Sequence, residues 1–174
     1  MSFDAFMYIK NDAAVKGETQ DDDMSKEGAF EILSFEFGAE NNINIGSISA
    51  GGGAGKATFK EGTVTKKTDT ASCGLFAKLC EGKHFEDAVI ELRRSGGAAG
   101  KSGATFLKFE LKMVMIQDIS WSGSDGDDIC EETVVFQYGA IKITYSQQNS
   151  KTGEMKKHSD AMFSRIKNKA DFVV

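Results

Sequence analysis

Apolar and polar side chains alternate with a period of two over much of the chain. The alternation is present at 33–37 and 88–92, and it is longest at 107–115, where charged residues fill even positions between apolar ones. Such alternation predicts β-strands that bury one face. Val114 and Ile116 make the other face apolar as well, so we expect this strand to run into a covered part of the sheet.

The segment 134–145 changes the parity of its apolar positions at Gly139. Apolar residues take even positions before this glycine and odd positions after it: Val134, Phe136, Tyr138, Ile141, Ile143 and Tyr145. One extra residue in a ladder produces such a change, so we predict a bulge or tight bend at Gly139. Bends of this kind curl sheets into barrels.

One segment, 72–82, predicts a helix. Ser72 can cap its start, and Gly82, followed by Lys83 and His84, predicts its end. Its apolar stripe consists of Leu75, Phe76 and Leu79. The stretch 159–169 is ambiguous between a short helix and a terminal strand, and its candidate anchors are Met162, Phe163 and Ile166.

Composition narrows the class of protein. A chain of 174 residues predicts about one domain and can bury a core without a disulfide or metal. The 19 glycines stand against no proline, so glycine makes most turns, and two glycine-rich loops lie at 46–55 and 96–103. The net charge of -5 argues against a nucleic-acid-binding protein, which needs a basic face. The start lacks a basic then apolar pattern, and no stretch approaches 18 apolar residues, so we expect neither a cleaved signal peptide nor membrane insertion.

The glycine-rich loops resemble phosphate-binding loops only superficially. A phosphate-binding loop needs Gly-x4-Gly-Lys-Ser/Thr followed by a helix. Ser95 stands at the first position of one loop, and the strand pattern that begins near Thr105 follows it. The other loop has Ala50 at its first position and Ala57 in place of the hydroxyl. We therefore interpret both loops as strand connections.

The acidic loop 124–128 suggests calcium, but its spacing does not fit. Counted from Asp125, the fifth and sixth positions are Ile129 and Cys130, whereas an EF-hand has a ligand at the fifth and glycine at the sixth. A solvated turn fits better. The sequence predicts no metal and no cofactor.

Nucleophilic catalysis would need Cys73 or Cys80 with His84, since a thiolate needs a nearby base. The two cysteines are seven residues apart, so both can lie on the apolar side of the predicted helix and act as small hydrophobes. Cys130 leaves an odd number of cysteines, which indicates a reducing compartment during synthesis. We predict that the chain is not an enzyme and has no catalytic residue.

Charge is distributed unevenly along the chain. Residues 1–40 carry ten acidic and three basic side chains, 118–132 carry six acidic and no basic ones, and 151–174 carry six Lys or Arg against three acids. A head-to-tail oligomer needs two different, complementary surfaces on each subunit, and such patches could supply them. Ordinary solvated faces would give the same charge pattern.

Several segments in order resemble the Hcp (haemolysin-coregulated protein) family, the inner-tube protein of bacterial type VI secretion systems. The matching segments are Phe3-Asp-Ala-Phe-Met-Tyr-Ile9, Val15-Lys-Gly-Glu-Thr19, Ile32-Leu-Ser-Phe-Glu-Phe-Gly38, Gly51-Gly-Gly-Ala-Gly-Lys56, Thr65-Lys-Lys-Thr-Asp69, Cys80-Glu-Gly-Lys-His84, Ile90-Glu-Leu-Arg-Arg-Ser-Gly-Gly97 and Glu132-Thr-Val-Val-Phe-Gln-Tyr-Gly139. The chain departs from the family pattern at Ser72-Cys73, where Ser-Pro is usual, at Phe163, where Trp is usual, and at an apparent insertion, 11–14. Trp121 also stands in a loop where small residues are usual.

The resemblance implies a mainly β fold, a small antiparallel β-barrel with one flanking α-helix like that of phage tail-tube proteins, spanning residues 1–174 without a fused toxin domain. It implies hexameric rings that stack into a tube, expelled when a sheath contracts, with small effectors carried in the lumen. Sheath, spike and effector proteins would be its partners. Such a protein would assemble in the bacterial cytoplasm and then be secreted.

Two sets of contact residues follow from this resemblance and the charge pattern. The glycine loop at about 46–58 would contact a neighbouring subunit or ring through Gly51, Gly52, Gly53, Ala54, Gly55 and Lys56. The acidic segment would face the lumen or the cargo through Ser120, Ser122, Asp125, Asp127 and Asp128. Two other functions remain open: a tail-tube protein of a phage-like contractile particle, and a small ligand-binding barrel or enzyme that uses the acidic loop or the Cys/His group.

Overall fold

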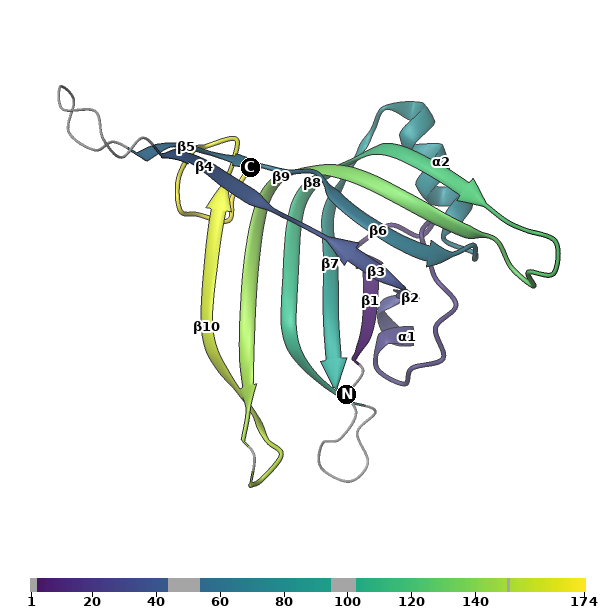
Figure 1. The fold of residues 1–174 in the computed structure, drawn as a ribbon, viewed down its shortest axis with the longest axis horizontal. Helices are drawn as coiled ribbons and strands as arrows, with labels where there is room; N and C mark the ends of the chain where they lie inside the picture. The colour runs from purple at the N-terminus through teal and green to yellow at the C-terminus, as the bar shows by residue number, and fades with distance from the viewer. Residues whose placement is uncertain (1–2, 44–53, 95–102, 150) are drawn as a thin grey trace.

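The computed structural model describes residues 3–43, 54–94, 103–149 and 151–174. The elements follow the chain (Figure 1) as β1 (Asp4–Ile9), α1 (Met24–Glu27), β2 (Phe30–Glu31), β3 (Ser34–Glu36), β4 (Ala39–Ile43), β5 (Ala54–Phe59), β6 (Gly62–Lys67), α2 (Ser72–Glu81), β7 (His84–Arg94), β8 (Ala104–Ser122), β9 (Glu131–Gln148) and β10 (Met155–Ser164). Neither helix in these ranges is long and apolar enough to cross a membrane.

One antiparallel sheet in the order β2-β1-β7-β8-β9-β6-β3 forms the body of the molecule, and β10 pairs with β9. The two outermost strands of this path, β2 and β3, are separated only by Ile32 and Leu33. The N–H of Ile32 donates to Ala5 O of β1 at 2.9 Å, and the N–H of Leu33 donates to Thr65 O of β6 at 2.7 Å. One short segment therefore joins both ends of the curled sheet, which confirms the predicted small antiparallel barrel.

The long strands β8 and β9 bend together, and the bend lies at Gly139. Ladder pairs join Lys112 to Ala140 and Val114 to Tyr138, so the two strands stay in register across the bend. Of the two predicted alternatives at Gly139, a bulge or a tight bend, the bulge is therefore wrong, because the strands bend there without an inserted residue. Met113, opposite Gly139, has a left-handed backbone with φ 52°, and the core-facing side chains change parity in both strands at this step. The buried positions of β9 do change parity at Gly139, as the sequence predicts, but the buried positions of β8 change at the paired residues, so the ladder keeps its register.

Close packing explains the glycine at this bend. A Cβ on residue 139 would lie 3.0 Å from side-chain atoms of Ile166 and Val174 and 3.2 Å from Cβ of Met113. The Arg165 N–H donates to Gly139 O at 2.8 Å. The last ten residues of the chain are thus held against the bend, where a larger residue would displace them.

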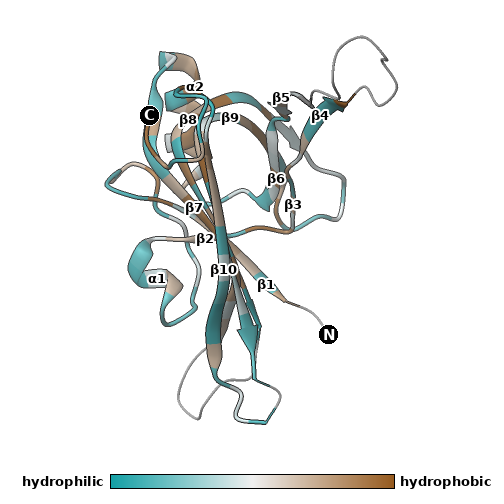
Figure 2. Ribbon diagram, turned by 90° about the vertical axis from the view of Figure 1, so that its left-hand side faces the viewer, coloured by the Kyte–Doolittle hydropathy of each residue, from teal (hydrophilic) through white to brown (hydrophobic). Residues whose placement is uncertain are grey.

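The core fills the inside of the curled sheet. Its buried side chains come mainly from β1, β7, β8 and β9, and they include Met7, Ile90, Leu111 and Phe136. Strands β7 and β8 are correspondingly hydrophobic along their buried stretches (Figure 2). Phe37 stacks on Phe109 with ring centroids 5.0 Å apart, which ties the chain after β3 to the opposite wall.

Helix α2 confirms the predicted helix, with two corrections. Ala71, not Ser72, is the N-cap residue, and Ser72 is buried with its hydroxyl engaged in a polar network described below. Gly82 ends the helix with φ 64°, as predicted. Phe76 is 46% exposed and does not belong to the buried stripe.

Two other expectations are changed or resolved. The four-residue helix α1 was not predicted, because among its side chains only that of Met24 is buried and so leaves no periodic pattern. The ambiguous stretch 159–169 is the end of strand β10 as far as Ser164, followed by turns.

Candidate assembly surfaces

Strands β4 and β5 form a two-stranded hairpin that projects from the body of the molecule (Figure 1). All five residues of β4 are exposed, and the ladder runs from Ala39 opposite Phe59 to Ile43 opposite Ala54. The predicted contact residues Ala54, Gly55 and Lys56 lie in β5, so this part of the expected loop is a strand. A Cβ on Gly55 would lie 2.9 Å from the Asn42 carbonyl oxygen, which explains this glycine. Gly51, Gly52 and Gly53 lie outside the described residues.

A cavity of about 580 Å³ opens at the base of this hairpin. Its walls come from β5, from the β8–β9 bend, from the end of β10 and from the chain that follows it, and they include Phe59, Met113, Met115, Gly139, Phe163 and Ile166. Among the described residues, its lining also contains two cationic side chains, Lys56 and Arg165, and no carboxylate. We call this surface the cationic cavity.

Aromatic contacts fix the shape of the cationic cavity. Phe59 stacks on Phe163 with centroids 5.4 Å apart. The Arg165 guanidinium lies 5.2 Å from the Tyr138 ring centroid and donates to Tyr138 O at 2.8 Å. The wall formed by these side chains is therefore ordered without a ligand.

The opposite end of the molecule carries the acidic residues predicted to face a lumen. Ser120 and Ser122 are exposed at the end of β8, in the last pairs of its ladder with β9. Asp125, Asp127 and Asp128 lie in the exposed turn that follows. Asp127 holds this turn, because its carboxylate accepts from the Ser124 N–H at 2.8 Å. These residues gather at one end of the long strands. Nothing in the structure tests their contact with a lumen.

An exposed aromatic pair stands beside this acidic end. Trp121, which is in β8 and not in a loop as expected, is 47% exposed, and its ring lies edge-on to Phe76 of α2 with centroids 5.6 Å apart. The indole N–H donates to Glu132 Oε2 at 2.7 Å, so the ring is held in one orientation. Sequence reasoning missed this pair, because the two residues are 45 positions apart. We call Phe76, Trp121, Ile129 and the neighbouring acids of 125–131 the acidic knob.

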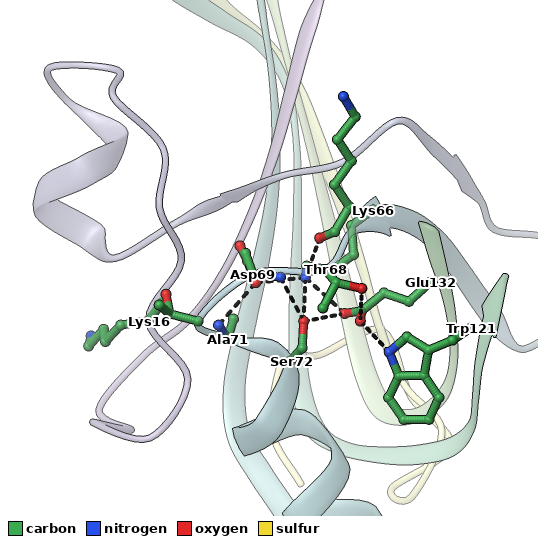
Figure 3. A network of polar contacts seen from close by, with 10 residues as sticks. Lys16, Lys66, Thr68, Asp69, Ala71, Ser72, Trp121 and Glu132 are labelled. Atoms are coloured by element: carbon green, nitrogen blue, oxygen red, sulfur yellow. Dashed lines mark hydrogen bonds and ion pairs between the residues drawn. The ribbon is translucent and has the colours of Figure 1, made fainter. Parts of the chain in front are cut away.

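A buried ionic network lies beside Trp121 and contacts it through Glu132 (Figure 3). The Lys66 side chain is fully buried, and its ammonium donates to Asp69 Oδ1 at 2.7 Å, to Glu132 Oε1 at 2.8 Å and to Ser72 Oγ at 3.1 Å. Thr68 donates to the second oxygen of Glu132 at 3.2 Å. A buried charge is tolerated when it is paired and hydrogen-bonded. This network joins β6, β9 and the start of α2.

A second polar cluster lies between β1, β7 and β8. Glu91 accepts from the Tyr8 hydroxyl at 2.8 Å and from Thr105 at 2.7 Å, with Lys108 Nζ at 3.3 Å. Burial alone would raise the pKa of Glu91, but these hydrogen bonds and the Lys108 charge outweigh it and hold the pKa below its usual 4.5. Burial and the Glu91 charge raise the pKa of the Tyr8 hydroxyl far above its usual value. Tyr8 also belongs to a buried apolar cluster with Met24 of α1.

The thiols do not behave as predicted. Cys73, Cys80 and Cys130 are all free and exposed, so the expectation that the two helical cysteines pack as small hydrophobes is wrong. The buried side of α2 is instead occupied by Ser72, Gly74 and Leu75. Within the described ranges, no three His, Cys, Asp or Glu side chains are grouped so as to hold a metal ion.

Comparisons with known proteins agree with this architecture. A family profile described as "Type VI secretion system effector, Hcp" matches residues 6–145. The curated protein Hcp1 of Pseudomonas aeruginosa is 28% identical over 95 residues, which is 55% of this chain and 57% of that protein's length.

Among solved structures, one described as a type six secretion system protein superposes with a TM-score of 0.85 at 28% identity, covering 98% of this chain and all of the other. Hcp1 from Salmonella typhimurium superposes with a TM-score of 0.73 at 23% identity, covering 98% of this chain and all of the other, and shows the same fold. From the profile match and the shared barrel, we conclude that the chain belongs to the Hcp family of the type VI secretion system.

Proposed function

We propose that this chain is a structural subunit of the inner tube of a type VI secretion system, forming hexameric rings that stack. The observation that carries the proposal is the superposition of almost the whole chain on a type VI secretion protein, at a TM-score of 0.85. The hairpin of β4 and β5, which projects from the barrel, supports it, because a projecting ladder offers main-chain and side-chain contacts to a neighbouring copy.

Two unlike surfaces of the molecule also support assembly. The cationic cavity lies at the base of the β4–β5 hairpin, and the acidic knob includes the turn between β8 and β9, which projects at the far right of Figure 1. Unlike surfaces on one subunit make head-to-tail contacts, and such contacts close into a ring when the rotation between copies allows it. In this role, the predicted residues Gly51, Gly52, Gly53, Ala54, Gly55 and Lys56 contact a neighbouring subunit or ring.

Partners and export follow from the same role. The ring stack is enclosed by a sheath, is expelled when that sheath contracts, and carries small effectors in its lumen. It assembles in the bacterial cytoplasm and is then secreted. The lumen contact of Ser120, Ser122, Asp125, Asp127 and Asp128 stays a prediction.

Native mass spectrometry and negative-stain electron microscopy of the pure protein test the proposal. We expect a mass of six subunits and ring-shaped particles. A monomer at every accessible concentration would contradict it. Bulky substitutions at Gly52 and Gly53 are expected to weaken stacking while leaving the fold intact.

If the protein functions as a tube subunit, its secretion should not depend on Cys73, Cys80 or His84. We expect secretion to persist when Cys73, Cys80 and His84 are all replaced by alanine. Loss of secretion by a folded, ring-forming triple variant would favour a ligand-binding or enzymatic role instead.

A further inference from the structure

The cationic cavity combines an apolar interior with a positive rim. Met115 is 40% exposed and Ile166 51% exposed, so apolar surface is open to solvent at its mouth. Methionine side chains adapt to the shape of a partner. Lys167, which follows the lining residue Ile166 in the chain, is an exposed cation of the turn after β10.

The acidic knob has the opposite design. Its apolar side chains, Phe76, Trp121 and Ile129, are between 46% and 51% exposed. Around Ile129, a groove of about 580 Å³ is lined by Asp127, Asp128 and Glu131 against a single cation, Lys67. An aromatic anchor with a polar rim is typical of the energetic centre of a protein–protein contact.

Trp121 is well suited to be that anchor. Its indole N–H is bonded to a buried carboxylate and its ring is braced edge-on by Phe76, so little rotamer freedom is lost on binding. The supporting carboxylate, Glu132, is in turn fixed by Lys66 and Ser72. The ring is thus half exposed and also preorganised.

We propose that the acidic knob of one copy docks in the cationic cavity of the next copy around the ring, which places Asp125, Asp127 and Asp128 between copies instead of facing the lumen. The proposal rests on the proposed function and names the contact that builds its ring. A second copy is favoured over an unrelated partner because the same chain presents both halves, with opposite charge, at separate places: the knob includes the turn between β8 and β9, at the far right of Figure 1, and the cavity is lined by β5, the β8–β9 bend and the end of β10. Complementary potentials of this kind steer and orient association.

Charge reversal tests the pairing without disturbing the fold. Lys56, Lys167, Asp125 and Asp128 are exposed, and no hydrogen bond or ion pair links their side chains to other described residues. In the variant Lys56→Glu/Lys167→Glu the cavity surface becomes acidic like the knob, and in Asp125→Lys/Asp128→Lys the knob becomes basic like the cavity. We expect each variant alone to associate at least tenfold more weakly than the wild type, because like charges then face each other.

Mixing the two variants is the decisive step. Copies with two acidic surfaces and copies with two basic surfaces can alternate around a ring of six, so the 1:1 mixture should regain hexamers containing three of each, which native mass spectrometry resolves by mass. Such rescue also shows that each variant is folded. Hexamers of each variant alone, or a mixture that stays dissociated, would overturn the inference.

Trp121 reports the same contact optically. It is the single tryptophan of the chain, so its emission should shift to the blue when rings form and docking buries the ring. Ile129→Asp, in the exposed turn away from the ionic network, should weaken association, whereas Trp121→Ala should weaken it about thirty-fold or more. Wild-type rings with unshifted emission would overturn this contact but leave the proposed function standing, whereas a wild-type monomer would overturn the proposed function.

Discussion

Replacement of Lys66 by methionine probes the most deeply buried charge in the described chain. The ammonium has no exposure, and four oxygens lie within 3.1 Å of it, on Lys67, Asp69, Ser72 and Glu132. Lys66→Met keeps the apolar stem but leaves the Glu132 carboxylate, 1% exposed, without its counter-charge. Removal of one partner of a buried pair costs about 3–5 kcal/mol. For a domain of this size, each kcal/mol lowers Tm by about 2–4 °C, so we expect a loss of about 6–20 °C.

Urea unfolding and calorimetry at a fixed protein concentration would measure this loss. Lys67→Met is the matched control, because Lys67 is the next residue of β6 and is exposed; its change should stay within about 0.5 kcal/mol. The double variant Lys66→Met/Glu132→Gln should be more stable than Lys66→Met, since it removes the more deeply buried of the two carboxylates that Lys66 pairs with. Equal stabilities of Lys66→Met and Lys67→Met would refute the reasoning.

Three further changes test other parts of the structure. Gly139→Val should cost about 1–3 kcal/mol in urea unfolding and speed hydrogen exchange in 165–174, because its side chain overlaps Ile166 and Val174; unchanged exchange would contradict the packing at the bend. Gly74→Ala should destabilise the fold although alanine favours helices by about 1 kcal/mol, because its Cβ would overlap the Ala14 carbonyl; a gain in Tm would show that this loop yields freely. Glu91→Gln should destabilise at neutral pH. Because the pKa of Glu91 is lowered on folding, its stabilising effect is present above the unfolded value of about 4.5 and is lost as pH falls through the folded value, so the variant and the wild type should converge at low pH.

The alternation of side chains was enough to predict much of the sheet. The segments 88–92 and 107–116 lie within β7 and β8. The expectation of one buried face is wrong for β7, where all residues from 88 to 93 are buried on both faces. The hairpin strand β4 was not predicted, because all of its side chains are exposed and main-chain pairing alone defines it. Short elements such as α1 leave too few buried positions for a period to show.

The assembly surfaces were only partly predictable. The acidic residues of the knob were visible as a run of charge, but Phe76 and Trp121 meet only through the tertiary fold. No sequence pattern distinguishes Lys66 from the other lysines, because its burial depends on a pairing with Glu132, 66 residues away. The cationic cavity joins four separated segments, so no local pattern predicts it.

The closure of the barrel by Ile32 and Leu33 has a consequence for the order of folding. Strands β7, β8, β9 and β10 follow one another as antiparallel neighbours, so their contacts need only short loops to close. We call the closure of the barrel by Ile32 and Leu33 the seam. Its contacts join distant segments: the Leu33 N–H bonds to Thr65 O, 32 residues further along the chain. Thr65 belongs to β6, which in turn pairs with β9, about 70 residues further on. Contacts between distant segments pay more loop entropy before they form. We therefore expect the antiparallel strands β7 to β10 to form early in folding and the seam to form late. Substitutions at the seam should then raise the unfolding rate more than they lower the folding rate.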